Sequence, residues 1–176
     1  RLCNLECALT DAGEPWRRSP KLFHFRSAER NVAVLRAAGI DAVSLANNHS
    51  VYNNEGWGAQ GLLDTIAALD AGGIGYFGAG ADLARARAPW LAEVNGLRVA
   101  FLGIDGVTAN YEVDPGVATG VVEYDAGATD TSPGTNPYAS SQFIPDIASA
   151  EDAADIVIPY FHMGAEYVGV PTVWAT

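Results

Sequence analysis

Two short apolar runs that each end in histidine constrain the fold of this chain more than any other feature. Residues 42–46 lead into Asn47-Asn48-His49, and residues 155–161 lead into His162. Apolar runs of this length are typical of buried strands, and α/β folds keep their chemistry at the carboxyl ends of strands. We therefore expect the side chains of Asn48, His49 and His162 to converge on one cleft.

A third polar group lies at the start of the chain, in the segment Asn4-Leu5-Glu6. Residues two apart in an extended segment lie on one face, so Asn4 and Glu6 are expected to point the same way. Carboxylate, amide and imidazole groups together suit a hydrolytic metal site. We expect Glu6 close to the two histidines. Structural roles stay open as alternatives, with Glu6 as a surface charge and Asn48 as a turn residue.

The first half of the chain has the spacing of alternating strands and helices. A helix is expected from Ser27, a candidate N-cap, to about Ala38, where Gly39 stops it. The next elements expected along the chain are a strand over residues 42–46, a helix over 58–71 and a strand over 74–77. This alternation predicts a βαβ layer with right-handed crossovers.

The second half is expected to begin with a hairpin, because Asn95-Gly96 separates apolar strands over residues 90–94 and 97–104. Residues 105–145 are rich in Gly, Thr, Ser, Pro and Asn, with only 121–124 resembling a strand. A segment of this length is predicted to be a long loop, a lid or a substrate-facing insertion, with disorder as the alternative. A helix over 146–154 precedes the strand that carries His162. We expect residues 1–176 to form a single domain.

Charge is distributed unevenly along the chain. All ten Lys and Arg residues lie at or before Arg98, where ten Asp and Glu balance them, so the net charge of −11 comes from residues 99–176. A surface this acidic disfavours nucleic acid and other polyanions unless a cation intervenes. A bound metal would supply such a cation, although an acidic face that promotes solubility explains the same pattern.

Six blocks of the chain resemble, in order, the motifs of the CapA family, which is named for its role in bacterial poly-γ-glutamate capsule synthesis and is similar in fold to calcineurin-like metallophosphatases. The blocks are Asn4-Leu5-Glu6, residues 44–50 around Asn47-Asn48-His49, residues 61–69, Gly78-Ala79-Gly80, residues 95–103, and residues 162–167, where Met163 replaces the usual Trp. The family's acidic residue shortly after the Asn-His pair is missing, and Glu55 is a candidate substitute. The family's first Gly-Asp motif and its last His-rich motif are absent.

The resemblance implies an α/β fold, a metallophosphatase-like sandwich of mixed β-sheets flanked by helices. It also implies a divalent metal ion, manganese, zinc or iron, held by Glu6, Asn48 and His162. His49 would be the proton donor or transition-state clamp, and Glu166 would hold His162 or line the cleft. The residues expected to bind substrate are Asn4, Asn47 and Tyr167. Because two family motifs are absent, we expect this chain to bind metal poorly or not at all.

A capsule-biosynthesis function with a metallophosphatase-type site is what this resemblance implies. The expected partners are poly-γ-glutamate or another anionic polymer and a membrane synthase, but not nucleic acid. The expected location is extracellular or at the cell envelope, with any signal or anchor outside this chain. A metal-dependent hydrolase of a phosphoester or a polymer amide bond is the alternative, and a metal-free polymer-binding module is a weaker one.

Overall fold

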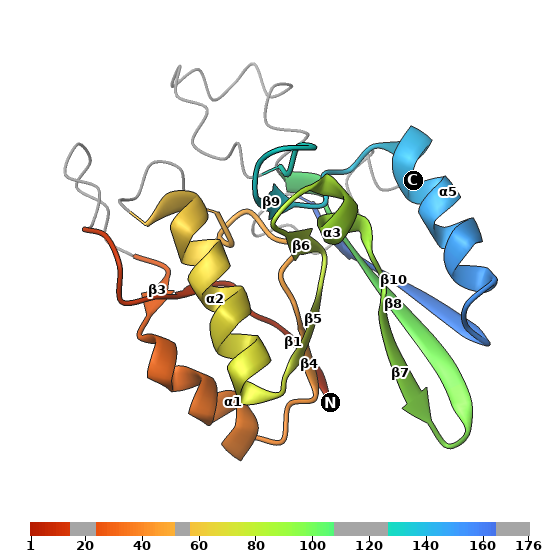
Figure 1. Ribbon diagram of the computed structural model, residues 1–176. Helices are drawn as coiled ribbons and strands as arrows, with labels where there is room; N and C mark the ends of the chain where they lie inside the picture. The colour runs from red at the N-terminus through yellow and green to blue at the C-terminus, as the bar shows by residue number, and fades with distance from the viewer. Residues whose placement is uncertain (15–23, 52–56, 108–126, 165–176) are drawn as a thin grey trace.

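Two three-stranded sheets dominate the computed structural model, which describes residues 1–14, 24–51, 57–107 and 127–164 (Figure 1). The first sheet is parallel and has the order β1 (Leu2–Asn4), β4 (Ala42–Ser44), β5 (Gly75–Phe77). The second is mixed and has the order β10 (Ile156–His162), β8 (Leu97–Asp105), β7 (Trp90–Val94), with β10 parallel and β7 antiparallel to β8. The predicted mixed α/β architecture is confirmed.

Two small sheets and five helical segments complete the described structure. One small sheet pairs β2 (Ala8–Leu9) with β3 (Arg26–Ser27), and the other pairs β6 (Ala79–Gly80) with β9 (Gly134–Thr135). The helical segments are the 3₁₀ turn η1 (Glu29–Asn31), α1 (Val32–Ala37), α2 (Gly58–Gly72), α3 (Leu83–Arg87) and α5 (Ser140–Glu151). None of the helices described here has the length and apolar content that crossing a membrane requires.

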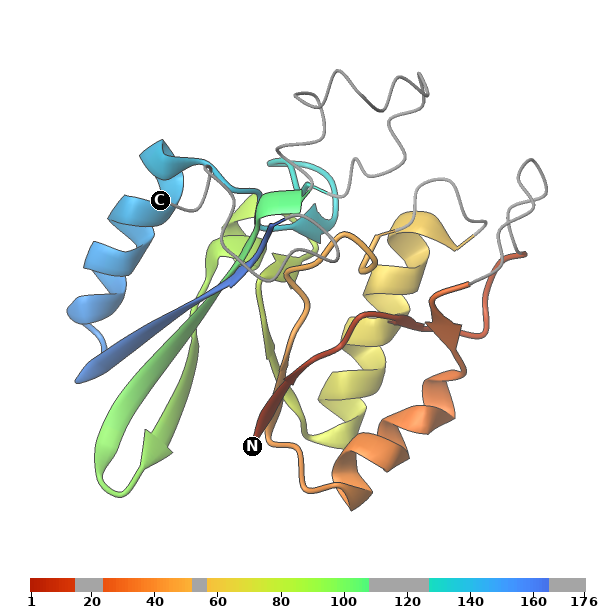
Figure 2. The same ribbon diagram turned by 180° about the vertical axis from the view of Figure 1, so that it is seen from behind.

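Helices α1 and α2 pack on the parallel sheet, as the views from both sides show (Figures 1 and 2). The buried residues of α2 recur at helical spacing, and they are Gly61, Leu62, Thr65 and Leu69. Leu62 and Leu69 join Val43 and Leu45 of the parallel sheet region in one core cluster. The helix ends at Gly73, whose φ of 67° is the left-handed conformation that suits a C-cap glycine.

Strand β8 forms the centre of the second core, because both of its faces are covered. On one face, Ala100, Leu102 and Ile104 pack against Ala150 near the end of α5 and Ala154 just after it. On the other face, Val99 and Phe101 pack against Phe77 of β5 and Trp90 of β7. The second face therefore joins the mixed sheet to the parallel sheet.

The backbones of the two sheets approach closely at Gly78 and Gly103. A Cβ atom added to Gly103 would lie 2.7 Å from the Cα of Gly78 and 2.9 Å from the Cβ of Ala46, so a larger residue has no space there. Asn136 hydrogen-bonds to both glycines: its backbone N–H donates to the Gly78 carbonyl (2.9 Å) and its side chain donates to the Gly103 carbonyl (2.8 Å). This contact fixes the distance between the sheets at Ala46, two residues before Asn48.

The elements with clear local signals lie where they were predicted. The βαβ alternation is confirmed, and so is the hairpin, in which Asn95 (φ 53°) and Gly96 (φ 81°) both have the positive φ of a type I′ turn. The first helix differs from the prediction. It starts as the 3₁₀ turn η1 after Ala28 rather than at Ser27, whose hydroxyl instead accepts a hydrogen bond from the side chain of Asn31 (2.7 Å).

The segment predicted as a long loop over residues 105–145 is more ordered at its end than expected. Strand β9 and the isolated bridges beside it occupy residues 127–137, and α5 begins at Ser140 rather than at residue 146. Proline is normally excluded from helix interiors, yet Pro145 lies within α5, and the prediction of a helix over residues 146–154 missed the part before it. Residues 108–126, including the strand-like 121–124, lie outside the described residues.

Candidate functional site

The carboxyl ends of β1, β4 and β10 bring polar side chains from distant parts of the sequence together. The central contact joins Oδ1 of Asn48 and Nε2 of His162, which lie 3.1 Å apart although 114 residues separate them in the chain. Asn48 follows β4 of the parallel sheet, and His162 ends β10 of the mixed sheet. The site therefore spans the junction of the two sheets.

Glu6 and His49 complete a cluster of four side chains around this contact. Oε1 of Glu6 lies 3.5 Å from Nε2 of His162 and 3.7 Å from Nε2 of His49. The amide nitrogen of Asn48 lies 3.3 Å from the same His49 nitrogen. Asn48 therefore presents its NH₂ group to His49 and its oxygen to His162, so one amide contacts both imidazoles.

The turn that carries Asn48 and His49 is held by Asn47, which is fully buried. The amide nitrogen of Asn47 donates to Oδ1 of Asn4 and to the Leu5 carbonyl, both at 3.1 Å. Its amide oxygen accepts from the His49 backbone N–H (3.0 Å) and the Ser50 hydroxyl (3.2 Å). The predicted substrate-binding role does not fit Asn47, because all four of its amide hydrogen-bonding positions are used inside the protein.

Asn4 has a similar place beneath the cluster. Its amide nitrogen donates to Oε2 of Glu6 (3.2 Å), while its oxygen accepts from Asn47. These two bonds orient the Glu6 carboxylate, whose side chain is 42% exposed, toward the histidines. The predicted residues Glu166 and Tyr167, and the candidate substitute Glu55, lie outside the described residues.

Phe25, just before β3, is a residue of the site that sequence reasoning missed. Its ring stacks on the His49 imidazole, with centroids 3.9 Å apart and planes inclined by 25°. The stacking and the neighbouring chain leave only 14% of the His49 side chain exposed. Aromatic and polar residues alternate in the run Phe23-His24-Phe25-Arg26, a pattern that could have indicated a strand. Nothing in this run, however, indicated a contact with His49.

Asp105 is a second missed residue, fully buried at the end of β8 and paired in register with His162. Its carboxylate accepts hydrogen bonds from the Thr135 hydroxyl (3.0 Å) and the Val107 backbone N–H (3.1 Å). A buried carboxylate needs such donors to offset its lost hydration. Asp105 therefore anchors the β9 segment beneath the strand end that presents His162.

The donor atoms of the cluster fit part of a metal coordination sphere. Adjacent ligands held about 2.1 Å from one ion lie roughly 3.0 to 3.4 Å apart, and the oxygen of Asn48, Nε2 of His162 and Oε1 of Glu6 have separations of 3.1 and 3.5 Å. Within the described ranges, however, no three His, Cys, Asp or Glu side chains form a group that could hold a metal ion. The three candidate ligands, Glu6, Asn48 and His162, therefore include the neutral amide of Asn48 and only one carboxylate.

Comparison with known proteins gives a consistent family. The family of bacterial capsule synthesis proteins, PGA_cap, matches residues 1–175. The capsule biosynthesis protein CapA of Bacillus anthracis is 30% identical over 161 residues, covering 89% of this chain and 35% of that protein. The PGA biosynthesis protein CapA of Bacillus subtilis is 29% identical over 157 residues, covering 89% and 37%.

A more similar but shorter match lies in Mycobacterium tuberculosis. There, a probable polyglutamine synthesis accessory protein is 41% identical over 102 residues, which cover 58% of this chain and 25% of that protein. The chain thus spans about a third of the length of the two Bacillus relatives.

Proposed function

Because the chain belongs to the family of bacterial capsule synthesis proteins, we propose that it takes part in making a poly-γ-glutamate capsule through the cluster at its strand ends. The observation that carries the proposal is the contact between Asn48 and His162, with Glu6 and His49 beside it. Both sheets contribute polar side chains to one partly exposed cluster. Removing polar groups from water costs free energy, so a purely structural role does not explain why they are gathered there.

The reaction class that suits these residues is hydrolysis of a phosphoester or of an amide bond in the polymer. Glu6, Asn48 and His162 would hold a divalent ion, which when bound polarises the substrate and lowers the pKa of a water. His49 has a separate task, since its Nε2 faces Glu6 and the amide nitrogen of Asn48 rather than the amide oxygen. A protonated His49 holds a proton at Nε2 and can give it to the leaving nitrogen or oxygen.

Partner and location follow from the same proposal. The polymer is anionic and the chain carries a net charge of −11, so contact between the two requires a cation at the site. A divalent ion at Glu6 and His162 would supply it. We place the protein at the cell envelope or outside the cell, where a capsule is built, with a membrane synthase as its partner.

A test of the proposal is the loss of capsule when the central contact is removed. His162→Ala, introduced into the protein in a capsule-forming bacterium, is expected to lower surface polymer by at least the roughly 10- to 100-fold that disturbing a metal-site residue costs. Glu29→Gln, a change of an exposed residue in η1, serves as the matched control and is expected to leave the capsule unchanged. Normal capsule with a correctly folded His162→Ala protein contradicts the proposal.

Metal binding by this chain is expected to be weak, because the described cluster offers only three donors and only one of them, the Glu6 carboxylate, is charged. Calorimetric titration with manganese or zinc should give a dissociation constant above about 10 μM, and His162→Ala should abolish the remaining heat. A sub-micromolar constant at full occupancy would show that Glu6, Asn48 and His162 suffice. No binding at all would favour the alternative in which the cluster holds polymer without a metal.

A further inference from the structure

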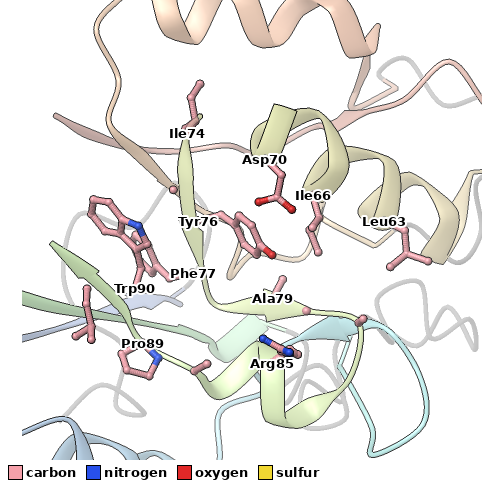
Figure 3. Close-up of a pocket in the computed structure, with 15 residues that line it drawn as sticks. Leu63, Ile66, Asp70, Ile74, Tyr76, Phe77, Ala79, Arg85, Pro89 and Trp90 are labelled. Atoms are coloured by element: carbon pink, nitrogen blue, oxygen red, sulfur yellow. The ribbon is translucent and has the colours of Figure 1, made fainter. Parts of the chain in front are cut away.

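A groove of about 530 Å³ lies along the outer edge of β5, between α2, α3 and β7 (Figure 3). This volume is in the range of small-molecule sites. None of its lining residues belongs to the cluster around His162. Apolar side chains supply most of its walls, among them Leu63 and Ile66 of α2 and Trp90 and Leu91 of β7. The groove is therefore a separate surface feature with no part in the function proposed above.

Two opposite charges that have no partner in the described part of the chain line this groove. Asp70 comes from the end of α2 and Arg85 from α3, and the Tyr76 ring projects between these helices in Figure 3. Burial raises the pKa of the Tyr76 hydroxyl, and the charge of Asp70 raises it further while that of Arg85 lowers it. Both charges therefore act on the same phenol, from separate elements.

Neither charge is neutralised by a neighbour among the residues that the structure describes. The Asp70 carboxylate and the Arg85 guanidinium have no hydrogen bond or ion pair there. Arg87, two residues further along α3, shows the contrast, because it forms a bidentate pair with Asp146 at 2.9 and 2.6 Å. An unpaired Arg and an unpaired Asp in one apolar groove fit a ligand that carries both charges.

The edge of β5 adds a backbone donor and acceptor to the groove. The Gly75 N–H donates to the Asp41 carbonyl and the Phe77 carbonyl accepts from the Leu45 N–H, so the odd-numbered residues of β5 face β4. In a strand the intervening residue has its N–H and C=O on the opposite side. The backbone groups of Tyr76 therefore point to the outer edge, where an extended peptide group can pair with them.

We propose that this groove binds a short zwitterionic peptide, about the size of a dipeptide, with its carboxylate at Arg85, its ammonium group at Asp70 and its peptide bond against Tyr76. The apolar walls favour an aliphatic side chain in the ligand. The Trp90 indole closes one side, packed so tightly on Gly75 that a Cβ atom there would lie 2.2 Å from Nε1. A ligand with only negative charge would place a carboxylate beside Asp70, which disfavours it.

The test uses three related probes and one reporter. The probes are L-alanyl-L-leucine, its N-acetyl derivative, which lacks the ammonium group, and its C-terminal amide, which lacks the carboxylate. The reporter is the indole N–H signal of Trp90 in a ¹⁵N NMR spectrum, identified by its absence in Trp90→Phe. The free dipeptide is expected to shift this signal saturably, with a dissociation constant of about 1 mM or below.

Two substitutions should distinguish the contribution of Arg85 to ligand binding from that of Asp70. Arg85→Gln is expected to weaken the dipeptide and its N-acetyl form roughly tenfold, and to leave the amide unchanged. Asp70→Asn is expected to weaken the dipeptide and the amide, and to leave the N-acetyl form unchanged. Arg30→Gln, which removes an exposed arginine from η1, is the matched control and should change nothing.

Several results would overturn the inference. One is the absence of a saturable Trp90 shift with all three probes up to about 20 mM. Another is equal weakening by Arg85→Gln and Arg30→Gln, which would make the effect one of overall charge. Loss of the shift in His49→Ala would assign the binding to the other site. Retention of dipeptide binding in His49→Ala supports the groove, whatever happens to capsule formation.

Discussion

Gly103→Val is expected to lower the free energy of unfolding by about 3 kcal/mol, near the upper end for an overpacked core position. The physical reason is the closeness of two backbones. A Cβ atom at residue 103 would meet the Cα of Gly78 at 2.7 Å and the Cβ of Ala46 at 2.9 Å. Neither atom lies on a flexible side chain that could move aside, so the strands themselves must separate. In a chain of this size, the melting temperature should fall by roughly 6 to 12 °C.

The same change is expected to disturb the functional site. Asn48 follows β4 and His162 ends β10, and the Gly78–Gly103 contact sets the spacing between their sheets. Moving the sheets apart by a few tenths of an ångström lengthens the 3.1 Å contact between the two side chains. The His162 imidazole signals in an NMR spectrum should therefore shift, even in the fraction of protein that stays folded.

Gly96→Ala provides the matched control, because it replaces another glycine without creating a contact. Gly96 has a φ of 81°, and a Cβ atom there would find no heavy atom within 4 Å. Only backbone strain is added, at a cost of about 1 kcal/mol. If the two variants lose the same stability, the close approach of the sheets is contradicted.

The parts of the fold that could be predicted have signals within a few neighbouring residues. Asn95-Gly96 determines a turn whose two positive φ values few other residues tolerate. The helix over residues 58–71 is found at Gly58–Gly72, because its apolar spacing and the glycines at its end agree. Strand β10 is likewise found at the apolar run before His162.

The parts that could not be predicted depend on contacts between residues far apart in the chain. Strand β9 has only two residues and exists because it pairs with β6, more than 50 positions earlier. Its sequence, Gly134-Thr135, has no strand pattern of its own. Phe25 reaches His49 for the same reason, since the short pair β2–β3 places it there.

The candidate site divides in the same way. Residue type and position after a strand were enough to select Asn48, His49, His162 and Glu6. They did not reveal that Asn47 would be buried, because its partners Asn4 and Leu5 lie more than 40 residues away. The family resemblance predicted that Asn47 binds substrate, whereas its four hydrogen bonds make it the support of the turn.

His49→Ala in the intact protein is expected to leave the metal content nearly unchanged and to lower turnover by roughly 10²- to 10⁴-fold, the usual contribution of a positioned proton donor. Metal should be retained because Nε2 of His49 lies beside the amide nitrogen of Asn48, which cannot bind a cation. The measurement combines metal analysis with the rate of hydrolysis of poly-γ-glutamate and of a phosphoester. If the protein only docks the polymer, neither form will turn over.

The variant Phe25→Leu tests how much the orientation of the His49 imidazole contributes to turnover, while the imidazole itself stays in place. Leucine keeps the apolar contact but removes the ring that stacks on the imidazole at 3.9 Å. The imidazole then stays in the site but loses part of its orientation, so a smaller loss of about tenfold is expected, in kcat more than in KM. Full turnover in His49→Ala would remove His49 from the mechanism. Loss of metal in that variant would instead make the imidazole a ligand, and Phe25→Leu should then weaken metal binding too.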